Sequence, residues 1–335
     1  MRTFGGFSVF IPMSKIEYNK TPKTLEEQVT LLERRGLTII DKDKAIKILA
    51  NISYNRRYPL LAEPKEDEIF KQGSTFETIF RIYQFDADLR VLVFYAIEQI
   101  EIAVRSQIIY HLSLKYKSGF WFEDSTIFKN YPQHIAFVSN VCKSIHETKQ
   151  EFITKYKNKY NNFLSPAWKS FELITFNSLN TLFKNLKDKN DQIPVSKHFG
   201  LTHEVFISWI ETLVYIRNIC AHHSRLWNVI LTISPTWLKS PKGKWVSKWE
   251  NESESATKGD KKLKMYSVLC MLTYLLDHIN PHHKFRQKLK SLLKEPKYKT
   301  TIDIAHMGFP ENWEEEPLWV YREVSTPPRK LAQLE

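Results

Sequence analysis

Glycine is scarce in this sequence, with only 9 in 335 residues. Tight β-hairpins and phosphate-cradling loops depend on glycine, because it adopts backbone conformations with positive φ at little cost. No glycine-rich nucleotide loop and no internal repeat is present. The scarcity counts against a hairpin-rich β protein and favours a helical architecture.

Cysteine is also rare, and its arrangement excludes two common kinds of site. Cys142, Cys220 and Cys270 are odd in number and show no C-x-x-C spacing, so neither a disulfide framework nor a zinc ribbon is indicated. Three unpaired cysteines fit a reducing compartment, and we therefore expect a cytoplasmic protein.

Long hydrophobic runs are absent as well. No segment approaches about 18 uninterrupted apolar residues, so we expect no stable insertion into a membrane. The N-terminal "MRTFGGFSVFIPMSKIEYNK" has a short apolar run without an A-x-A cleavage site, which predicts no signal peptide.

What the chain does contain is an apolar core and positive charge. Hydrophobic residues make up 42% and aromatic residues 13%, which is ample for a folded interior. The net charge of +12 points to an anionic partner, either nucleic acid or an anionic membrane surface. A basic protein without such a partner is the alternative.

Apolar residues recur at helical spacing along most of the chain. Thr24 and Glu27 form a capping-box pair that starts a helix, and Gly36 is placed to end it. A second short helix follows in "DKDKAIKILANIS", and residues 53–74 read as a loop. Thr75–Tyr116 lacks proline and glycine and predicts one long helix or two abutting helices.

Further helices are expected in the second half of the sequence. They are predicted at about 134–160, from Ser165 with Pro166 in the first turn, around 195–199, from Thr202 as N-cap, at 261–279 and at 281–293. The fold class is therefore all-α. We expect a small helical N-terminal lobe at 1–70, a helical bundle at 71–295, and a tail at 296–335 that packs on the bundle.

Residues 217–228, "RNICAHHSRLWN", concentrate polar groups after the apolar segment "VFISWIETLVYI". Arginine can hold a phosphate with two parallel hydrogen bonds. A histidine side chain, with a reference pKa near ~6.5, can take a proton from a 2′-OH or return one to a leaving 5′-oxygen. Arg217 and His222 thus fit metal-independent cleavage of RNA to 2′,3′-cyclic phosphate and 5′-OH ends, whereas DNA lacks the attacking 2′-OH.

The spacing of this pair is awkward for one regular helix. Five residues turn a helix so far that the Arg217 and His222 side chains lie about 140° apart. The site therefore needs a helix end, a contribution from His223, or a second protomer. An alternative is that both histidines cap the helix C-terminus while Arg217 pairs with an acid such as Glu211. The spacing alone is expected by chance about once in such a chain.

A second pair with similar spacing, Arg105 and His111, lies inside the long predicted helix. Glu101 and Arg105 are an ordinary i,i+4 ion pair, which is the simplest interpretation. A supporting role, in which Arg105 or Glu98 holds the helix of Arg217, is the next. A metal site is a poor interpretation of the histidines, because no H-E-x-x-H occurs and adjacent histidines on a helix point apart, so we expect no metal and no cofactor. The histidines concerned are His222, His223, His278, His282 and His283.

Three basic stretches interleave lysines with aromatic residues: "KSIHETKQEFITKYKNKYNN", "LKSPKGKWVSKW" and "HHKFRQKLKSLLKEPKYK". This combination matches backbone charge plus base stacking in RNA. The alternatives are solvated helix faces with aromatics turned inward or, for 281–294, a helix on a membrane surface. The residues expected to bind RNA are Lys143, Lys155, Lys157, Lys159, Lys242, Lys244, Lys284, Arg286, Lys288 and Lys290.

Four stretches together resemble the Abi-like family of bacterial abortive-infection proteins, of the AbiD/AbiF type. They are "KTPKTLEEQVTLLERRGLTIIDKDKAIKILANISYNRRYPL", "FKQGSTFETIFRIYQFDADLRVLVFYAIEQIEIAVRS", "FELITFNSLNTLFKNL" and "IRNICAHHSRLWN". They occur in family order between Lys20 and His278. The family is regarded as part of the HEPN superfamily, which implies a HEPN-like bundle and a ribonuclease with an R-x(4–6)-H motif.

On this resemblance Arg217 and His222 take the catalytic positions, and Asn218 fills the polar place after the arginine. The resemblance implies antiviral defence by damage to RNA, often as a toxin held in check by an antitoxin, and association with a small structured non-coding RNA. Because such nucleases pair two motifs across a dimer, it also implies a homodimer. The competing hypotheses are a non-catalytic RNA-binding protein and a protein-interaction component at a membrane.

Overall fold

The computed structural model describes residues 17, 21–52, 69–246 and 264–320, which form two compact units, Met1–Glu77 and Thr78–Glu335. Several predictions fall outside the described residues. They concern the N-terminal apolar run, residues 53–68 of the predicted loop, residues 247–263 with Lys248 and Trp249 of the second basic stretch, and residues 321–335 of the tail.

The first unit holds α1 (Leu25–Arg34) and α2 (Lys42–Leu49). The predicted capping box is confirmed, since the Glu27 amide donates to the Thr24 hydroxyl and the Thr24 amide donates to the Glu27 carboxylate. After α1 the chain turns at Gly36 with φ +87°, a left-handed conformation that glycine adopts readily. Residues at its own two ends thus set where α1 begins and where the chain turns after it.

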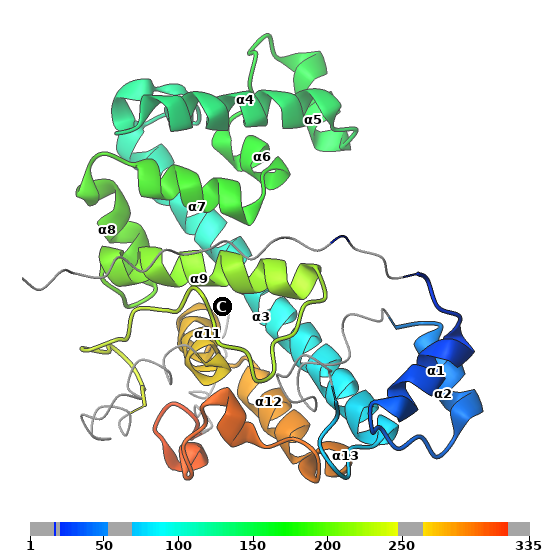
Figure 1. The fold of residues 1–335 in the computed structure, drawn as a ribbon. Coiled ribbons are helices and arrows are strands. Elements are labelled where there is room, and N and C mark those ends of the chain that lie inside the picture. The colour runs from blue at the N-terminus through cyan, green and yellow to red at the C-terminus, as the bar shows by residue number, and fades with distance from the viewer. Residues whose placement is uncertain (1–16, 18–20, 53–68, 247–263, 321–335) are drawn as a thin grey trace, which may run out of the picture. The chain divides into compact units, whose positions relative to one another are not determined.

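The long apolar stretch forms a single helix, α3 (Phe76–Tyr116), of 41 residues, or ~60 Å along its axis. Leu89, Val93, Ala96 and Ile100 are fully buried at helical spacing and face the interior of the second unit. The opposite face of α3 carries several exposed apolar side chains, among them Val91 and Ile102. In Figure 1 α3 runs diagonally behind α9.

Residues 134–160 do not form the one helix predicted but two, α4 (Tyr131–Glu147) and α5 (Glu151–Lys159). The break lies at Thr148, which is extended and whose hydroxyl accepts a hydrogen bond from the Gln150 amide. A local side-chain acceptor of this kind competes with the helical hydrogen-bond ladder. The sequence prediction missed this competition.

The helix predicted from Ser165 is likewise divided, into α6 (Ala167–Ser170) and α7 (Phe176–Asn185). Pro166 is the N-cap of α6, and Thr175 starts α7 by accepting from the Ser178 amide. Then come α8 (Lys189–His198) and α9 (His203–Ala221), whose predicted N-cap Thr202 accepts from the Val205 amide.

Helix α11 (Met265–Ile279) is the most deeply buried element, since every side chain from Met265 to Leu276 is buried. A helix that is apolar all round belongs inside a core. Helices α12 (Phe285–Lys294) and α13 (Pro296–Lys299) follow, and the later segment packs back through Trp319, which donates to the Tyr266 hydroxyl at 2.9 Å.

Short 3-10 helices connect these elements at Trp121–Glu123, Ser125–Ile127, Phe171–Leu173, Ile304–Met307 and Trp313–Glu315. Within the described ranges the backbone otherwise makes two isolated bridges and no β-strand. The all-α prediction is confirmed.

Candidate functional site

The polar group of the "RNICAHHSRLWN" segment lies at the C-terminal end of α9. His222 is the C-cap, and its amide donates to the Asn218 carbonyl at 2.9 Å. The His223 amide donates to the Cys220 carbonyl and the Ser224 amide to the Ile219 carbonyl, the hydrogen-bond pattern of a Schellman motif. The site therefore lies where the helix ends, which is one of the arrangements compatible with the spacing of Arg217 and His222.

His223 occupies the left-handed position of this motif, with φ +53°. Glycine is the usual residue there, although histidine enters this region more often than most residues. The His222 and His223 side chains and that of Asn218 are exposed to solvent. Both histidines thus have the capping position foreseen as an alternative, and both remain accessible.

Arg217 reaches from α9 towards α3, where its guanidinium lies 5.8 Å from the centre of the Phe94 ring. Phe94, Glu98, Glu101 and Arg105 are spaced by four, three and four residues, so they share one face of α3. Burial raises the pKa of Glu101, against the opposing charges of Arg105 and Arg217. Glu101, which the sequence prediction paired with Arg105 alone, also interacts electrostatically with Arg217.

The suggested ion pair of Arg217 with Glu211 is wrong. Within the described residues the Glu211 carboxylate forms its ion pair with the Lys184 amine, at 3.0 Å. The Glu101–Arg105 ion pair is confirmed, at 2.7 Å. Arg105 also donates to the Ile174 carbonyl, which ties α3 to the segment before α7.

His111 lies apart from the Arg217 group. Burial lowers its pKa, and so does the neighbouring His198. In the described part of the chain no hydrogen bond or ion pair joins Arg105 to His111. Arg105 is engaged as a structural cation.

Asp86 of α3 holds the loop that follows the two histidines. Its carboxylate accepts the Leu226 amide at 2.8 Å and the Trp227 amide at 2.7 Å, and it forms an ion pair with Arg90. Arg90 in turn donates to the Ser224 carbonyl at 3.3 Å. Burial raises the pKa of Asp86, while these amides and Arg90 act in the opposite direction.

Sequence reasoning missed this clamp because its partners lie 140 and 141 positions apart. The only local signal was an aspartate and an arginine four residues apart inside an apolar helix. Such a pair is usually a surface ion pair, but here both residues are buried.

Cys220 lies within the same segment but is not a reactive thiol. It is buried, and burial raises its pKa to about 12. Because the thiolate is the nucleophilic form, a thiol held protonated at neutral pH is inert. Chemistry at this helix end therefore rests on the arginine and the imidazoles.

The first basic stretch lies on α4 and α5. Lys143 is exposed, Lys155 pairs with Glu151 at 2.6 Å, and Lys157 donates to the Ile145 carbonyl. The Lys159 amine lies 5.4 Å from the centre of the Tyr160 ring. Tyr156 is buried, so part of this stretch follows the alternative in which aromatics turn inward.

The second stretch also turns its tryptophan inward, since Trp245 is buried. The side chain of Lys242 is exposed, and the Lys244 amine donates to the Val320 carbonyl at 3.4 Å.

In the third stretch the residues expected to bind RNA differ in exposure and in their partners. Lys284 is exposed as the N-cap of α12, and Lys290 lies 3.7 Å from Glu314. The Lys288 amine lies 4.8 Å from the centre of the Tyr95 ring on α3. Tyr95 follows Phe94, whose ring Arg217 contacts, so Lys288 and Arg217 lie over neighbouring aromatic residues of one helix.

Arg286 requires a correction. It is buried, donates to the Leu318 carbonyl at 2.6 Å, and forms an ion pair with Asp277 beside His283. A guanidinium enclosed in this way cannot face RNA. Burial alone would raise the pKa of Asp277, but hydrogen bonds from His283 and Arg286 outweigh it and lower the pKa.

The described residues contain no cluster of three or more His, Cys, Asp or Glu side chains arranged to hold a metal ion. None of the helices in these ranges combines the length and hydropathy that crossing a membrane requires.

The fold and the site define an all-α protein in which a core-packed helix presents arginine, asparagine and histidine at its exposed end. The sequence profile of the Abi-like protein family matches residues 47–228, more than half of the chain, so this chain belongs to that family. The match ends at Asn228, the last residue of the "RNICAHHSRLWN" segment. No curated protein and no solved structure matches. The family points to abortive infection, a form of defence against phage.

Proposed function

We propose that this Abi-like protein is a HEPN-type effector of abortive infection that binds RNA and cleaves it without a metal ion. The observation that carries the proposal is the exposed end of α9. There Arg217, Asn218 and His222 meet solvent, while the Asp86 clamp fixes the chain directly behind them. A fixed backbone behind exposed polar groups is what a site of defined geometry requires.

In this mechanism Arg217 binds the scissile phosphate and neutralises the charge that builds up on it. His222 takes the proton from the 2′-OH, whose oxygen attacks the phosphorus, and a second imidazole returns a proton to the departing 5′-oxygen. The bond to the 5′-oxygen breaks, which leaves a 2′,3′-cyclic phosphate and a 5′-OH. Asn218 is placed one residue after Arg217 to hydrogen-bond the same phosphate.

RNA reaches this site over α3. Phe94 and Tyr95 are adjacent, and each carries a cation, Arg217 and Lys288 respectively. Aromatic faces with neighbouring cations are typical of single-stranded RNA binding, because bases stack and phosphates find charge. With a net charge of +12, the protein is suited to hold a small structured non-coding RNA as its regulator.

The second imidazole comes from a second copy of the chain, so the working enzyme is a homodimer. The exposed face of α3 supports this assembly, because Val91 and Ile102 are 71% and 55% exposed and flank the Phe94–Glu101 face. A partner that covers these side chains would bury apolar surface and bring its own Arg217 and His222 near.

The test is RNA cleavage by purified protein in the presence of EDTA, with 3′ and 5′ ends identified. Wild type and an Arg81→Ala/His146→Ala control, which loses the same residue types at exposed positions of α3 and α4, should cleave equally. Arg217→Ala/His222→Ala should lose at least a hundredfold. Equal cleavage by the latter variant and the control would overturn the catalytic assignment.

Copurified RNA tests the partner. Gently purified protein should carry nucleic acid that RNase removes and that alkali hydrolyses. Retained RNA without cleavage in any variant would favour the non-catalytic binding protein, in which Arg217 holds phosphate and His222 caps α9. Protein free of RNA under these conditions would count against a stable RNA complex.

A further inference from the structure

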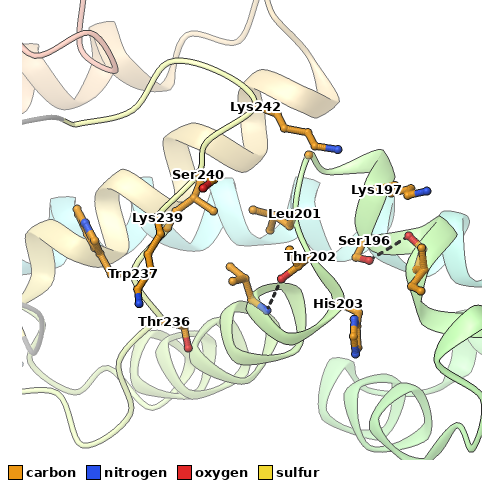
Figure 2. Close-up of a pocket in the computed structure, with 14 residues that line it drawn as sticks. Ser196, Lys197, Leu201, Thr202, His203, Thr236, Trp237, Lys239, Ser240 and Lys242 are labelled. Atoms are coloured by element: carbon orange, nitrogen blue, oxygen red, sulfur yellow. Dashed lines mark hydrogen bonds between the residues drawn. The ribbon is translucent and has the colours of Figure 1, made fainter.

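A cavity of about 440 Å³ lies at the opposite end of α9, between the turn from α8 to α9 and the loop of residues 236–242 (Figure 2). Its size falls within the range of ~300–1,000 Å³ that small-molecule sites occupy. Leu201, Val205 and Trp237 give it apolar walls, and Figure 2 shows Leu201 and Thr202 facing the loop that carries Lys239 and Ser240.

The two walls are held in place by side chains of the core. Trp209 donates to the Thr236 carbonyl at 2.7 Å, and the Thr236 amide donates to the Ser208 hydroxyl at 2.9 Å. The Tyr274 hydroxyl of α11 accepts from the Lys242 amide and donates to the Gly200 carbonyl. One buried hydroxyl thus joins the loop to the α8–α9 turn, so the cavity is built before any ligand arrives.

Gly200 shows how closely this turn packs. Its φ is +67°, and a Cβ there would lie 2.4 Å from Nε2 of His278. The chain therefore uses glycine to bring the turn against α11. The cavity follows from this packing rather than from a loosely placed surface loop.

The charged side chains that line the cavity are basic. Lys197, Lys239 and Lys242 line it, and in the described part of the chain no carboxylate lies within ion-pair distance of their amines. None of the described residues in the lining is acidic. His203 also lines it but pairs with Glu204 at 3.1 Å, so it is not counted among the free cations.

We propose that this cavity binds one nucleotide, with the base against Leu201, Val205 and the half-buried Trp237, and the phosphate at the lysine-bearing rim, next to Lys239 or Lys242. An apolar interior beside unpaired amines matches the two halves of a nucleotide. The hydroxyl groups of Thr202 and Ser240 lie in the lining and can meet polar edges of the base and the sugar, whereas that of Ser196 donates to carbonyls of its own helix.

The position of the cavity gives it a role beside the candidate site. His203 and Arg217 are fourteen residues apart on α9, which separates the two ends by ~21 Å along the helix. A strand anchored at the cavity spans several nucleotides before it reaches Arg217. Within the proposed function, which this role assumes, the cavity selects the register of the RNA; nucleotide binding itself does not depend on catalysis.

The test is calorimetric titration of the full-length protein with the four nucleoside 5′-monophosphates, the matching nucleosides and inorganic phosphate. At least one nucleotide should bind tenfold more tightly than its nucleoside and than phosphate. Lys239→Ala/Lys242→Ala should weaken this binding at least tenfold, and Trp237→Ala should weaken it while Trp237→Phe retains it. Lys129→Ala/Lys187→Ala, which removes two exposed lysines elsewhere, should stay within twofold of wild type.

A labelled RNA dodecamer distinguishes the source of the nucleotide. Weaker dodecamer binding in Lys239→Ala/Lys242→Ala than in Lys129→Ala/Lys187→Ala supports a nucleotide within a strand, and unchanged dodecamer binding with lost monophosphate binding supports a free nucleotide. Three results would overturn the proposal. Inorganic phosphate could bind as tightly as any nucleotide, the two lysine double variants could lose nucleotide affinity equally, or no nucleotide could show saturable binding.

Arg217→Ala/His222→Ala separates this inference from the proposed nuclease. The variant should keep the part of nucleotide binding that Lys239→Ala/Lys242→Ala removes, whatever its cleavage activity. If wild type does not cleave RNA but binds nucleotide through Lys239 and Lys242, the nuclease proposal fails and the cavity proposal stands. If wild type cleaves RNA through Arg217 but binds no nucleotide, the cavity proposal fails and the nuclease proposal stands.

Discussion

Replacing Asp86 by alanine should release the loop behind the two histidines of α9. The change leaves the Leu226 and Trp227 amides unpaired, at ~1–3 kcal/mol each, and strips the buried Arg90 of its counter-ion, which costs ~3–5 kcal/mol. Because these losses overlap, we expect the free energy of unfolding of this unit to fall by roughly 4–6 kcal/mol. Asp86→Asn keeps an acceptor for both amides and should lose ~3 kcal/mol.

Amide hydrogen exchange of Leu226 and Trp227, together with thermal unfolding, measures the effect. Asp88→Ala is the matched control, because Asp88 lies on the same helix and is half exposed. It loses a surface ion pair with Lys297 and the hydrogen bond from the Tyr298 hydroxyl, about 1–3 kcal/mol in all, so amide exchange rather than Tm is the decisive comparison. Exchange at the two amides should accelerate strongly in Asp86→Ala, slightly in Asp86→Asn, and not at all in Asp88→Ala.

Two results would refute this reasoning. Slow exchange of both amides in Asp86→Ala would mean that the carboxylate does not hold the loop. In the double variant Asp86→Asn/Arg90→Met, the loss of stability should be smaller than the sum of the losses in the two single variants, because each single change already breaks the same ion pair. Losses that add up fully would mean that Arg90 does not depend on Asp86.

Three further predictions concern single residues. His223→Gly should stabilise the protein by up to ~1 kcal/mol, seen as a higher Tm, because glycine suits the left-handed position. Cys220→Ala should leave RNA cleavage unchanged, and thiol reagents should not inhibit the native protein, because the buried thiol stays protonated. The lowered pKa of Asp277 contributes stability that is fully present above its unfolded pKa of ~3.9 and is lost as pH falls through the lower folded pKa. Asp277→Asn should therefore cost roughly 3 kcal/mol of stability at pH 7, seen as a lower Tm, and the difference in Tm from wild type should shrink as the pH falls below ~3.9.

The features that sequence could predict are those decided by neighbouring residues. Thr24 with Glu27, Gly36 and Thr202 mark helix ends through contacts within a few positions, and the structure has them as expected. The break at Thr148 is also local, but it depends on a hydroxyl outcompeting the helical ladder. Apolar periodicity carries no information about that competition.

The candidate site was predictable in its residue types but not in its supports. Glu101 and Glu98 both lie on the face of α3 near Arg217, and only packing makes Glu101 half-buried while Glu98 stays exposed. Asp86 meets Leu226 through the tertiary fold. Arg286 stands in a basic run, yet Asp277 and the Leu318 carbonyl draw it inward, so charge in the sequence did not reveal exposure.

The burial of α11 from Met265 to Leu276 has a consequence for how this protein folds during its synthesis. A chain leaves the ribosome from its N-terminus, so α9 with Arg217 and His222 emerges before α11 exists to cover Trp209. Until Tyr274 joins the α8–α9 turn to the 236–242 loop, the nascent chain exposes apolar surface that invites aggregation or a chaperone. A chain that ends before residue 264 should therefore yield insoluble protein, which a solubility assay of the truncated and full-length chains would check.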